Sequence, residues 1–448
     1  MTQMKRIFIF GALALLLAGC SSQLDQIRPK DKISSAAVNE ADLSKLTNGI
    51  LNRMESLTVS FWCDGDYLGE NFTSGPGFDY ADVHGEIVSS SSSWAKSRWQ
   101  TGFVALMHIN ELLKSANSAN PESTSTIQAK GTAYFFRAYV YYQLVTRFGG
   151  VPILTEPSMG VVPISPEADV WAQIIADLNE AEKYLEPVSN VYRPSDEACW
   201  ALLSKVFLWT GDKAKAIEYA DKVINSTKFV LSKTSEEFAG MYVAGQASKE
   251  IVFALANKRS TSFLRIFEKM NDTDASFNYS MAEELRTGLF ADKNGTGDIR
   301  KDPTYNPAFP VRIIKFPNGG QNMGQFIANE DPSASPIMVL RLADAYLTKA
   351  EAQGASAGLA TMKTFMESRY ASVNLPASMN DKEFQNLVLD ENNREFYAEG
   401  RRWFDIKRTK RTDLYKTWNG RDYLLYWPIP QDEIDLVGKE AYPQNPGY

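Results

Sequence analysis

The chain has 448 residues, of which 44% are hydrophobic and 23% are charged, and these fractions are typical of a globular protein. A chain of this length can bury a large core without disulfides or metals, either as two or three domains or as one large helical body. The formal net charge is −7, with acidic and basic residues interspersed, so no basic stripe of the kind that binds nucleic acid is present. A nucleic-acid partner is therefore excluded.

The N-terminus has the pattern of a secretory signal. Lys5 and Arg6 form a short positive region, and residues 7–17 are apolar apart from Gly11. This run is shorter than the about 20 residues that a membrane-spanning helix needs. No later segment has enough consecutive apolar residues to cross a bilayer. We therefore predict a cleaved signal peptide over residues 1–19.

The sequence after the apolar run predicts a lipid anchor. Residues 17–20, Leu-Ala-Gly-Cys, resemble a bacterial lipobox, in which the signal is cut before the cysteine and that cysteine is acylated. Several acyl chains give stable membrane anchoring. We predict lipidation of Cys20 followed by a polar tether over residues 20–35; a plain signal peptide ending near Gly19 is the alternative. Ser21 stands where the usual inner-membrane retention signal has Asp.

Cysteine and histidine are too few for a metal site or a Ser-His-Asp triad. Beyond Cys20, the chain has Cys63 and Cys199, which could form a single bridge, although two free thiols are favoured. His84 and His108 show no metal-ligand spacing with each other or with cysteine. We expect no metal and no catalytic residue.

Helical periodicity dominates the rest of the chain, so the fold is predicted to be mainly α. Apolar residues recur at helical spacing over 133–148, where Gly149 and Gly150 then stop the helix, and again over 171–185. Residues 195–210 and 213–225 form a close helical pair across Gly211, with the alternation of small and large residues found in tetratricopeptide-like helix pairs. A similar pair is predicted to begin at 339–351.

Two other stretches lack helical periodicity and predict a loop-rich subregion with a few short strands. Residues 64–85 are rich in Gly, Asp and aromatics, and residues 272–331 contain many Gly and Pro. Long irregular insertions in a compact helical body are usually functional or disordered. Strands are expected at 250–255 and 311–316.

Several motifs occur in the order found in one known family. They are Ala129–Pro152 with its exit turn, Trp171–Ala181, Pro336–Ala352, Arg394–Arg408, Trp427–Ile434 and the ending Gln444–Tyr448. On these motifs the chain resembles the SusD/RagB family of outer-membrane nutrient-binding lipoproteins over nearly the whole mature length. We accordingly expect one SusD-like body over 36–448, with an N-terminal half at about 36–230 and a C-terminal half at about 250–448.

The resemblance implies a function. It implies a surface-exposed lipoprotein of the outer membrane that captures oligosaccharide and delivers it to a SusC-like TonB-dependent transporter barrel. A peptide or another nutrient is the alternative ligand, since some relatives prefer peptides. The membrane would be contacted through the lipid anchor only.

The carboxylates of the Arg394–Arg408 motif could suggest an enzyme. Glu395, Glu399, Arg402, Asp405 and Arg408 lie at helical spacing, so they are expected to form ion pairs. A surface glycoside hydrolase would need a pair of carboxyl groups in a cleft, one of them with a raised pKa. Arginine pairing keeps carboxylates ionised, so we predict a structural network and no catalysis.

A calcium-loop pattern is present but incomplete. Residues 292–298 have the spacing of calcium ligands, but Pro303 stands where a bidentate Glu is required. The family tends to carry Asp-x-Arg at this place, which Asp298 and Arg300 match. No cofactor is expected, and calcium at this loop is the alternative.

Aromatic residues beside carboxylates are the candidates for glycan contact. Each aromatic could simply hold its loop to the body, or it could stack on sugar rings while Asp, Asn and Arg bind hydroxyls. Because the family places its ligand site mainly on early loops, that region is ranked first and the late loop second. The candidates are Trp62, Asp64, Asp66, Tyr67 and Trp94, followed by Tyr279 and Tyr305. The site is expected to be shallow and to face solvent.

Overall fold

A computed structural model shows the arrangement of the chain. It describes residues 40–62, 64–74, 89–158, 160–243, 248–257, 279–291, 293–317, 324, 326–327, 335–415 and 420–448. Cys20, Cys63, His84, the signal peptide and the tether lie outside the described residues. Structural statements about absence below refer to the described residues alone.

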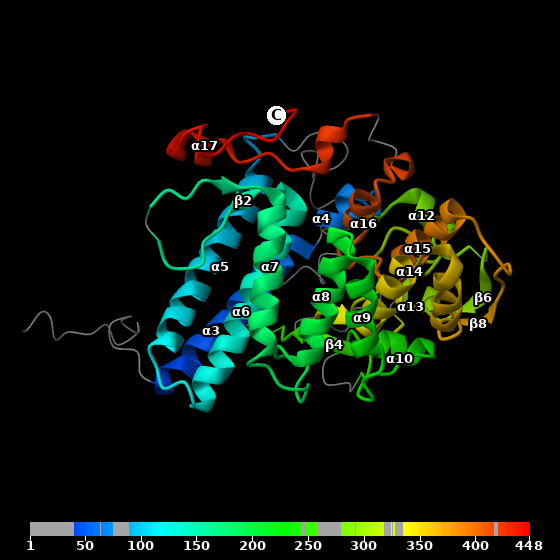
Figure 1. Cartoon of the computed structure of the whole chain (residues 1–448). Coiled ribbons are helices and arrows are strands. Elements are labelled where there is room, and N and C mark those ends of the chain that lie inside the picture. The colour runs from blue at the N-terminus through cyan, green and yellow to red at the C-terminus, as the bar shows by residue number, and fades with distance from the viewer. Residues whose placement is uncertain are drawn as a thin grey trace, which may run out of the picture.

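Helices make up most of the described chain, and several of them are long (Figure 1). In the N-terminal part they are α3 (Glu40–Trp62), α5 (Ser93–Asn117), α6 (Thr124–Phe148), α7 (Glu167–Glu182), α8 (Asp196–Thr210) and α9 (Lys213–Ile224). Later helices are α14 (Leu342–Met366), α15 (Asp381–Glu395), α16 (Arg402–Thr409) and α17 (Gln431–Val437). The mainly α fold is therefore confirmed.

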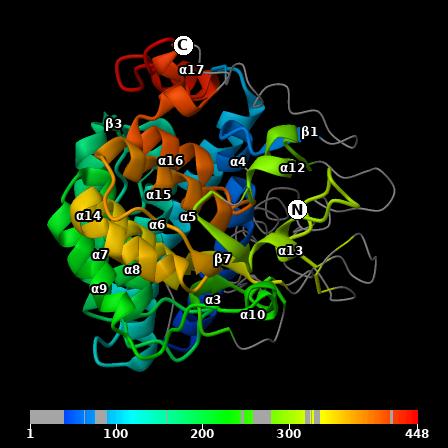
Figure 2. The same cartoon turned by 90° about the vertical axis from the view of Figure 1, so that its right-hand side faces the viewer.

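The predicted helix pairs are present, and a later helix joins them. α5 packs on α6, α6 on α7, and α8 on α9, while α14 from the C-terminal part packs against both α8 and α9. Figure 2 shows α14 beside α8 and α9. Side-chain caps at Ser123, Ser195 and Asp212 begin α6, α8 and α9. Gly149 and Gly211 end α6 and α8 with positive φ angles of 73° and 82°, as their glycine character predicts.

Short helices and strands occur in both parts of the chain, most of them after residue 230. The short helices are α4 (Asp64–Leu68), α10 (Ser235–Gly240), α12 (Glu283–Gly288) and α13 (Lys301–Thr304), with 3₁₀ turns η3 (Thr412–Leu414) and η4 (Asp422–Leu425). The strands form antiparallel pairs: β1 (Phe72–Ser74) with β5 (Tyr279–Met281), β2 (Val151–Pro152) with β3 (Ile164–Ser165), β4 (Ile251–Leu255) with β7 (Ile337–Arg341), and β6 (Gly295–Asp298) with β8 (Tyr370–Val373).

Three predicted elements differ from the structure. Residues 64–68 form helix α4 instead of a loop, and residues 337–341 form β7 before the helix predicted at 339 begins. The strand predicted at 311–316 is absent, although the segment is mostly buried. The backbone turns at the start of this segment, where the Arg312 N–H donates to the Phe309 carbonyl at 3.0 Å, and the Lys315 Nζ then donates to the carbonyl oxygens of Glu395 and Tyr397 at 3.0 and 2.9 Å. The apolar run there reflects burial among the C-terminal residues and not sheet pairing.

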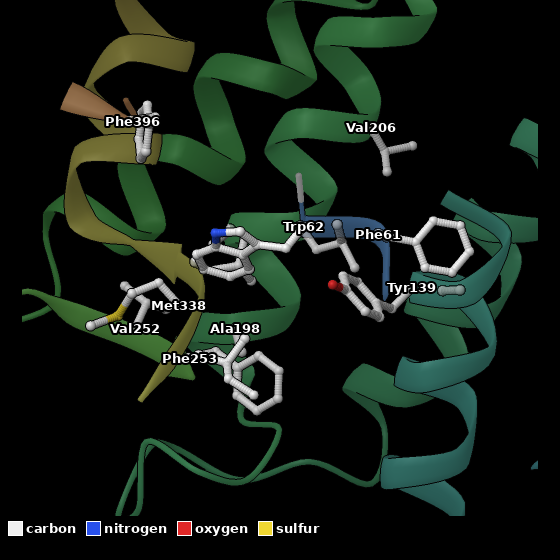
Figure 3. Packing of buried hydrophobic residues seen from close by; sticks show 14 of the residues in the cluster. Phe61, Trp62, Tyr139, Ala198, Val206, Val252, Phe253, Met338 and Phe396 are labelled. Atoms are coloured by element: carbon white, nitrogen blue, oxygen red, sulfur yellow. The ribbon is translucent and has the colours of Figure 1, made fainter. Parts of the chain in front are cut away.

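One hydrophobic cluster reaches from Leu43 in α3 to Ile434 in α17. Figure 3 shows part of this cluster, where Trp62 lies between Met338 of β7 on one side and Phe61 and Tyr139 on the other. Cys199 is a free thiol in this core, and its Sγ donates to the carbonyl of Leu178 at 3.3 Å, so it is not bridged. None of the helices in the described ranges is long and apolar enough to cross a membrane.

Candidate functional site

Helix α4 holds most of the predicted ligand residues. It follows α3 directly and packs on α16, which lies over 300 residues later in the chain. A Cβ on Gly65 would overlap the carbonyl oxygen of Gly400, and a Cβ on Gly400 would overlap that of Trp62. These two glycines therefore allow backbones from the two ends of the chain to touch. The Gly-rich sequence by itself predicts a loop, because the contact with Gly400 is not visible locally.

Asp64 is a buried ion-pair centre. Its carboxylate accepts hydrogen bonds from Arg98 Nη2 and Arg147 Nε, each at 2.9 Å, and from Trp94 Nε1 at 2.8 Å. The side chain has no exposed surface. Burial lowers the pKa of Arg147 to about 10, although Asp64 favours its charged form. Two guanidinium groups and an indole thus tie α4 to helices α5 and α6.

Asp66 links α4 to the turn before α16. One carboxyl oxygen accepts from Asn71 Nδ2 at 2.6 Å, and the other accepts from the Gly400 backbone N–H at 2.5 Å. Burial raises the pKa of Asp66 to about 7, despite these hydrogen bonds and the nearby Lys315 ammonium. The carboxyl group is thus half-protonated near neutral pH.

The aromatic residues bring the early and late regions together. The Tyr67 ring lies 5.5 Å from that of Tyr279 and 5.8 Å from that of Phe72, with edge-on geometry in both pairs. Phe72 and Tyr279 belong to the paired strands β1 and β5. Trp62 Nε1 donates to the carbonyl of Ala398 at 2.7 Å. The two regions, ranked separately from the sequence, are therefore neighbours through Tyr67 and Tyr279.

Burial corrects the expectation of a shallow site made by these residues. Trp62, Asp64, Asp66, Tyr67 and Tyr279 are each at most 6% exposed, so their side chains do not face solvent. Their contacts join α4 to α5, to α6, to the turn at Gly400 and to strands β1 and β5, so packing outweighs sugar stacking for these residues.

Trp94 and Tyr305 are the half-buried members of the predicted set. Trp94 lies in the first turn of α5, and the guanidinium of Arg98 stacks over its ring at 3.8 Å from the centroid. Tyr305 follows α13, and its backbone N–H donates to Lys301 at 2.8 Å. These two rings retain surface that a ligand could contact.

Glu395 and Glu399 of the Arg394–Arg408 motif are ion-paired as predicted, but their partners come from other parts of the chain and not from neighbouring turns of one helix, because α15 ends at Glu395 and α16 begins at Arg402. Glu395 accepts from Arg341 Nη1 at 2.6 Å, from Arg369 Nε at 2.9 Å and from Arg300 Nη1 at 3.2 Å. Burial alone would raise the pKa of Glu395, but Arg369 and Arg341 hold it well below its usual range. Glu395 is therefore ionised and cannot serve as a proton donor.

Glu399 is also a buried carboxylate that is held ionised by cationic side chains. It accepts from Lys315 Nζ at 2.6 Å, from Arg341 Nη2 at 2.9 Å and from the Tyr242 hydroxyl at 2.8 Å. Arg341 and Lys315 outweigh burial and lower its pKa. Arg408 pairs with Asp405 at 3.0 Å, as predicted.

Arg402 is the exception, because its Nη1 donates to the carbonyl of Leu389 instead. Sequence spacing missed partners that other elements supply, including Glu250, Arg369 and Glu391.

Asp298, which belongs to the calcium-loop pattern, forms an ion pair with Arg300. Both of its carboxylate oxygens accept from Arg300, with Nε at 2.8 Å and Nη2 at 2.7 Å. Asp292 lies outside the described residues. In the described part of the chain, no group of three or more His, Cys, Asp or Glu side chains is arranged to hold a metal.

Comparison with known proteins agrees with this architecture. Residues 24–208 match the family described as "Starch-binding associating with outer membrane", and residues 259–423 match the SusD family. The chain belongs to the SusD/RagB family.

The family membership extends to relatives of similar length. SusD-like protein P2 of Formosa agariphila is 24% identical, with 98% of this chain and 99% of that protein aligned. Starch-binding protein SusD of Bacteroides thetaiotaomicron is 25% identical over 72% of this chain and 73% of its own length.

Solved structures share the fold. A putative sugar-binding protein from Bacteroides vulgatus matches with a TM-score of 0.74 and 22% identity, covering 93% of this chain and all of that one. A laminarin-binding SusD-like protein matches with a TM-score of 0.70 and 21% identity, covering 92% and 100%. The mainly α, SusD-like architecture predicted from the sequence is confirmed.

Proposed function

We propose that the protein is a cell-surface lipoprotein that captures an oligosaccharide and passes it to a SusC-like TonB-dependent transporter. The observation that carries this proposal is the family match over both parts of the chain, together with relatives named for binding starch and laminarin. Acylated Cys20 would hold the body at the outer membrane, and the helical body would contact the transporter.

The proposed glycan contacts are the half-buried rings of Trp94 and Tyr305. Trp94 is held by Asp64 below it and Arg98 beside it, so its ring has a fixed position before any ligand arrives. A rigid aromatic surface loses little conformational entropy when a sugar ring stacks on it. The buried residues around α4 support this surface and do not contact the glycan themselves.

A binding survey tests the proposal. The purified body, without residues 1–20, should migrate more slowly in native gels that contain starch or laminarin than in gels without polysaccharide. Bovine serum albumin, run alongside, should be unaffected. Binding to a peptide library without any retardation by glycans would favour the peptide alternative.

We also propose that the bound glycan is not cleaved, because the motif carboxylates Glu395 and Glu399 are ionised and held by Arg and Lys. Prolonged incubation with laminarin or starch should leave the chain-length distribution unchanged by chromatography. Release of short oligosaccharides that stops in a Glu395→Gln variant would overturn this part of the proposal.

A further inference from the structure

A cavity of about 100 Å³ lies between α6, α8, α14 and the start of α16. At about 30 Å³ per water molecule, this volume holds about three waters or a ligand of three to four non-hydrogen atoms. Apolar side chains such as Met338 and Leu347 form part of the lining, and charged side chains such as Lys205 and Arg401 form another part. Neither of these cations takes part in the hydrogen bonds of Asp64 or Asp66.

Two cations in this lining share one carboxylate. Lys205 Nζ donates to Asp344 Oδ1 at 3.0 Å, and Arg401 Nη1 donates to the same oxygen. The other oxygen of Asp344 accepts from the Arg341 backbone N–H at 2.8 Å at the start of α14. Burial opposes ionisation of Asp344, but Lys205 and Arg401 hold its pKa below the usual range. Both carboxylate oxygens of Asp344 thus accept hydrogen bonds.

Lys205 and Arg401 have donors that Asp344 does not use. An ammonium group has three N–H donors and a guanidinium has five. Among the described residues, Asp344 is the hydrogen-bond acceptor of each side chain, and Lys205 is only 9% exposed. Burial and the neighbouring Arg401 lower the pKa of Lys205 to about 8, as expected where two cations face one carboxylate. An additional acceptor would stabilise both.

The remaining charged side chains of the lining have other partners. Arg147 pairs with Asp64, and Glu399 pairs with Lys315 and Arg341. Arg408 Nη2 donates to Asp405 at 3.0 Å, and Arg408 Nη1 donates to Glu351. The negative charge of Asp405 stabilises the charged forms of Lys205 and Arg401, but Asp405 makes no ion pair with either side chain. The N–H donors that these ion pairs do not use therefore lie on the side of the cavity formed by Lys205 and Arg401.

We propose that this cavity binds a small carboxylate of about four non-hydrogen atoms, whose oxygens accept hydrogen bonds from Lys205 and Arg401. The carbon end would lie against the apolar lining at Met338 and Leu347. A ligand of this size cannot bind tightly, so a dissociation constant in about the millimolar range is expected. The site is independent of glycan binding.

Acetate is the probe. Saturation-transfer NMR on the wild-type protein should show acetate contact with the protein, at constant pH and with chloride maintaining ionic strength. Unlabelled formate should compete. Absence of an acetate signal up to about 50 mM, well above the expected dissociation constant, would overturn the proposal and leave the cavity to water.

Variants locate the site. Lys205→Met should weaken acetate binding at least about tenfold, because an uncharged side chain of similar length donates no hydrogen bond. Lys215→Met, at an exposed position on α9, is the matched control and should bind as the wild type does. Equal binding by the Lys205 variant would overturn the proposal. If that variant does not fold, Arg401→Gln replaces it, with the same expected loss and the same overturning result.

Discussion

The carboxyl group of Asp66 is buried between α4 and the turn at Gly400, and burial raises its pKa to about 7 from 3.8. Between these two pH values the folded chain binds a proton that the unfolded chain has lost. The free energy of unfolding contributed by Asp66 therefore falls as pH rises from about 4 to about 7, by about 4 kcal/mol at most. Above pH 7 the contribution is constant.

An Asp66→Asn variant tests the predicted direction of this pH dependence. The amide is neutral at every pH, so this loss of stability between pH 4 and 7 should vanish, whatever constant offset the amide introduces. Urea unfolding at several pH values measures the effect, with Asp435→Asn on exposed α17 as the control. Wild-type and Asp66→Asn curves that run parallel across this window would show that Asp66 is ionised throughout.

Trp94 is the residue at which glycan stacking can be separated from packing. Trp94→Ala removes both the aromatic rings and the indole N–H that binds Asp64, whereas Trp94→Phe removes the five-membered ring with its N–H and keeps one aromatic ring. If the ring contacts sugar, the alanine variant should lose about 1–3 kcal/mol of binding free energy and the phenylalanine variant much less. Calorimetric titration with the bound glycan measures both. Equal losses would assign the effect to the Asp64 hydrogen bond.

At the scale of elements, the close contact between α4 and the start of α16 depends on Gly400. Its φ angle is 74°, and a Cβ there would overlap the carbonyl oxygen of Trp62. Gly400→Ala should therefore destabilise the fold by more than about 3 kcal/mol, combining left-handed strain with a backbone clash. Gly211→Ala is the matched control, because Gly211 also has a positive φ but has no atom within 4 Å of an added Cβ.

The Gly211→Ala control measures the cost of the left-handed backbone conformation without a steric clash. Gly211→Ala should cost about 1–2 kcal/mol, which is the penalty for a left-handed alanine alone. Chemical unfolding of both variants gives the comparison. Similar losses in the two variants would mean that α4 can move away from Gly400 at little cost, and the contact would not be important for the fold.

The elements predicted correctly are those whose cause is local. The apolar stripe over 133–148 and Gly149 describe α6 without any distant residue, and Gly211 likewise separates α8 from α9. Helix α4 was missed because its stability comes from Gly400 and from arginines on α5 and α6. The burial of the predicted ligand residues was missed for the same reason, since Trp62 binds a carbonyl 336 positions later in the chain.

At the scale of the whole molecule, residues from both parts of the chain share one core, and buried ion pairs such as Arg341–Glu250 and Arg369–Glu395 join its segments. Such pairs add little net stability over an apolar packing, but removing one partner leaves an uncompensated charge in the interior. We infer that the network fixes the relative positions of β4, β7 and α15. Arg300, which precedes α13, pairs with Glu395 in the same network and would keep the following Tyr305 in place for a ligand.

The attachment of this body to a membrane is the remaining prediction. The described helices provide no membrane span, whereas residues 17–20 have the lipobox pattern before Cys20. Several acyl chains on one cysteine would anchor the protein stably. Cys20→Ala should therefore move the protein from the membrane fraction to the soluble fraction, and Ser21→Ala should not. Mass spectrometry of the wild-type N-terminal peptide should show the acyl chains. Membrane retention of Cys20→Ala, with no acyl mass on the wild type, would show that another feature holds the protein there.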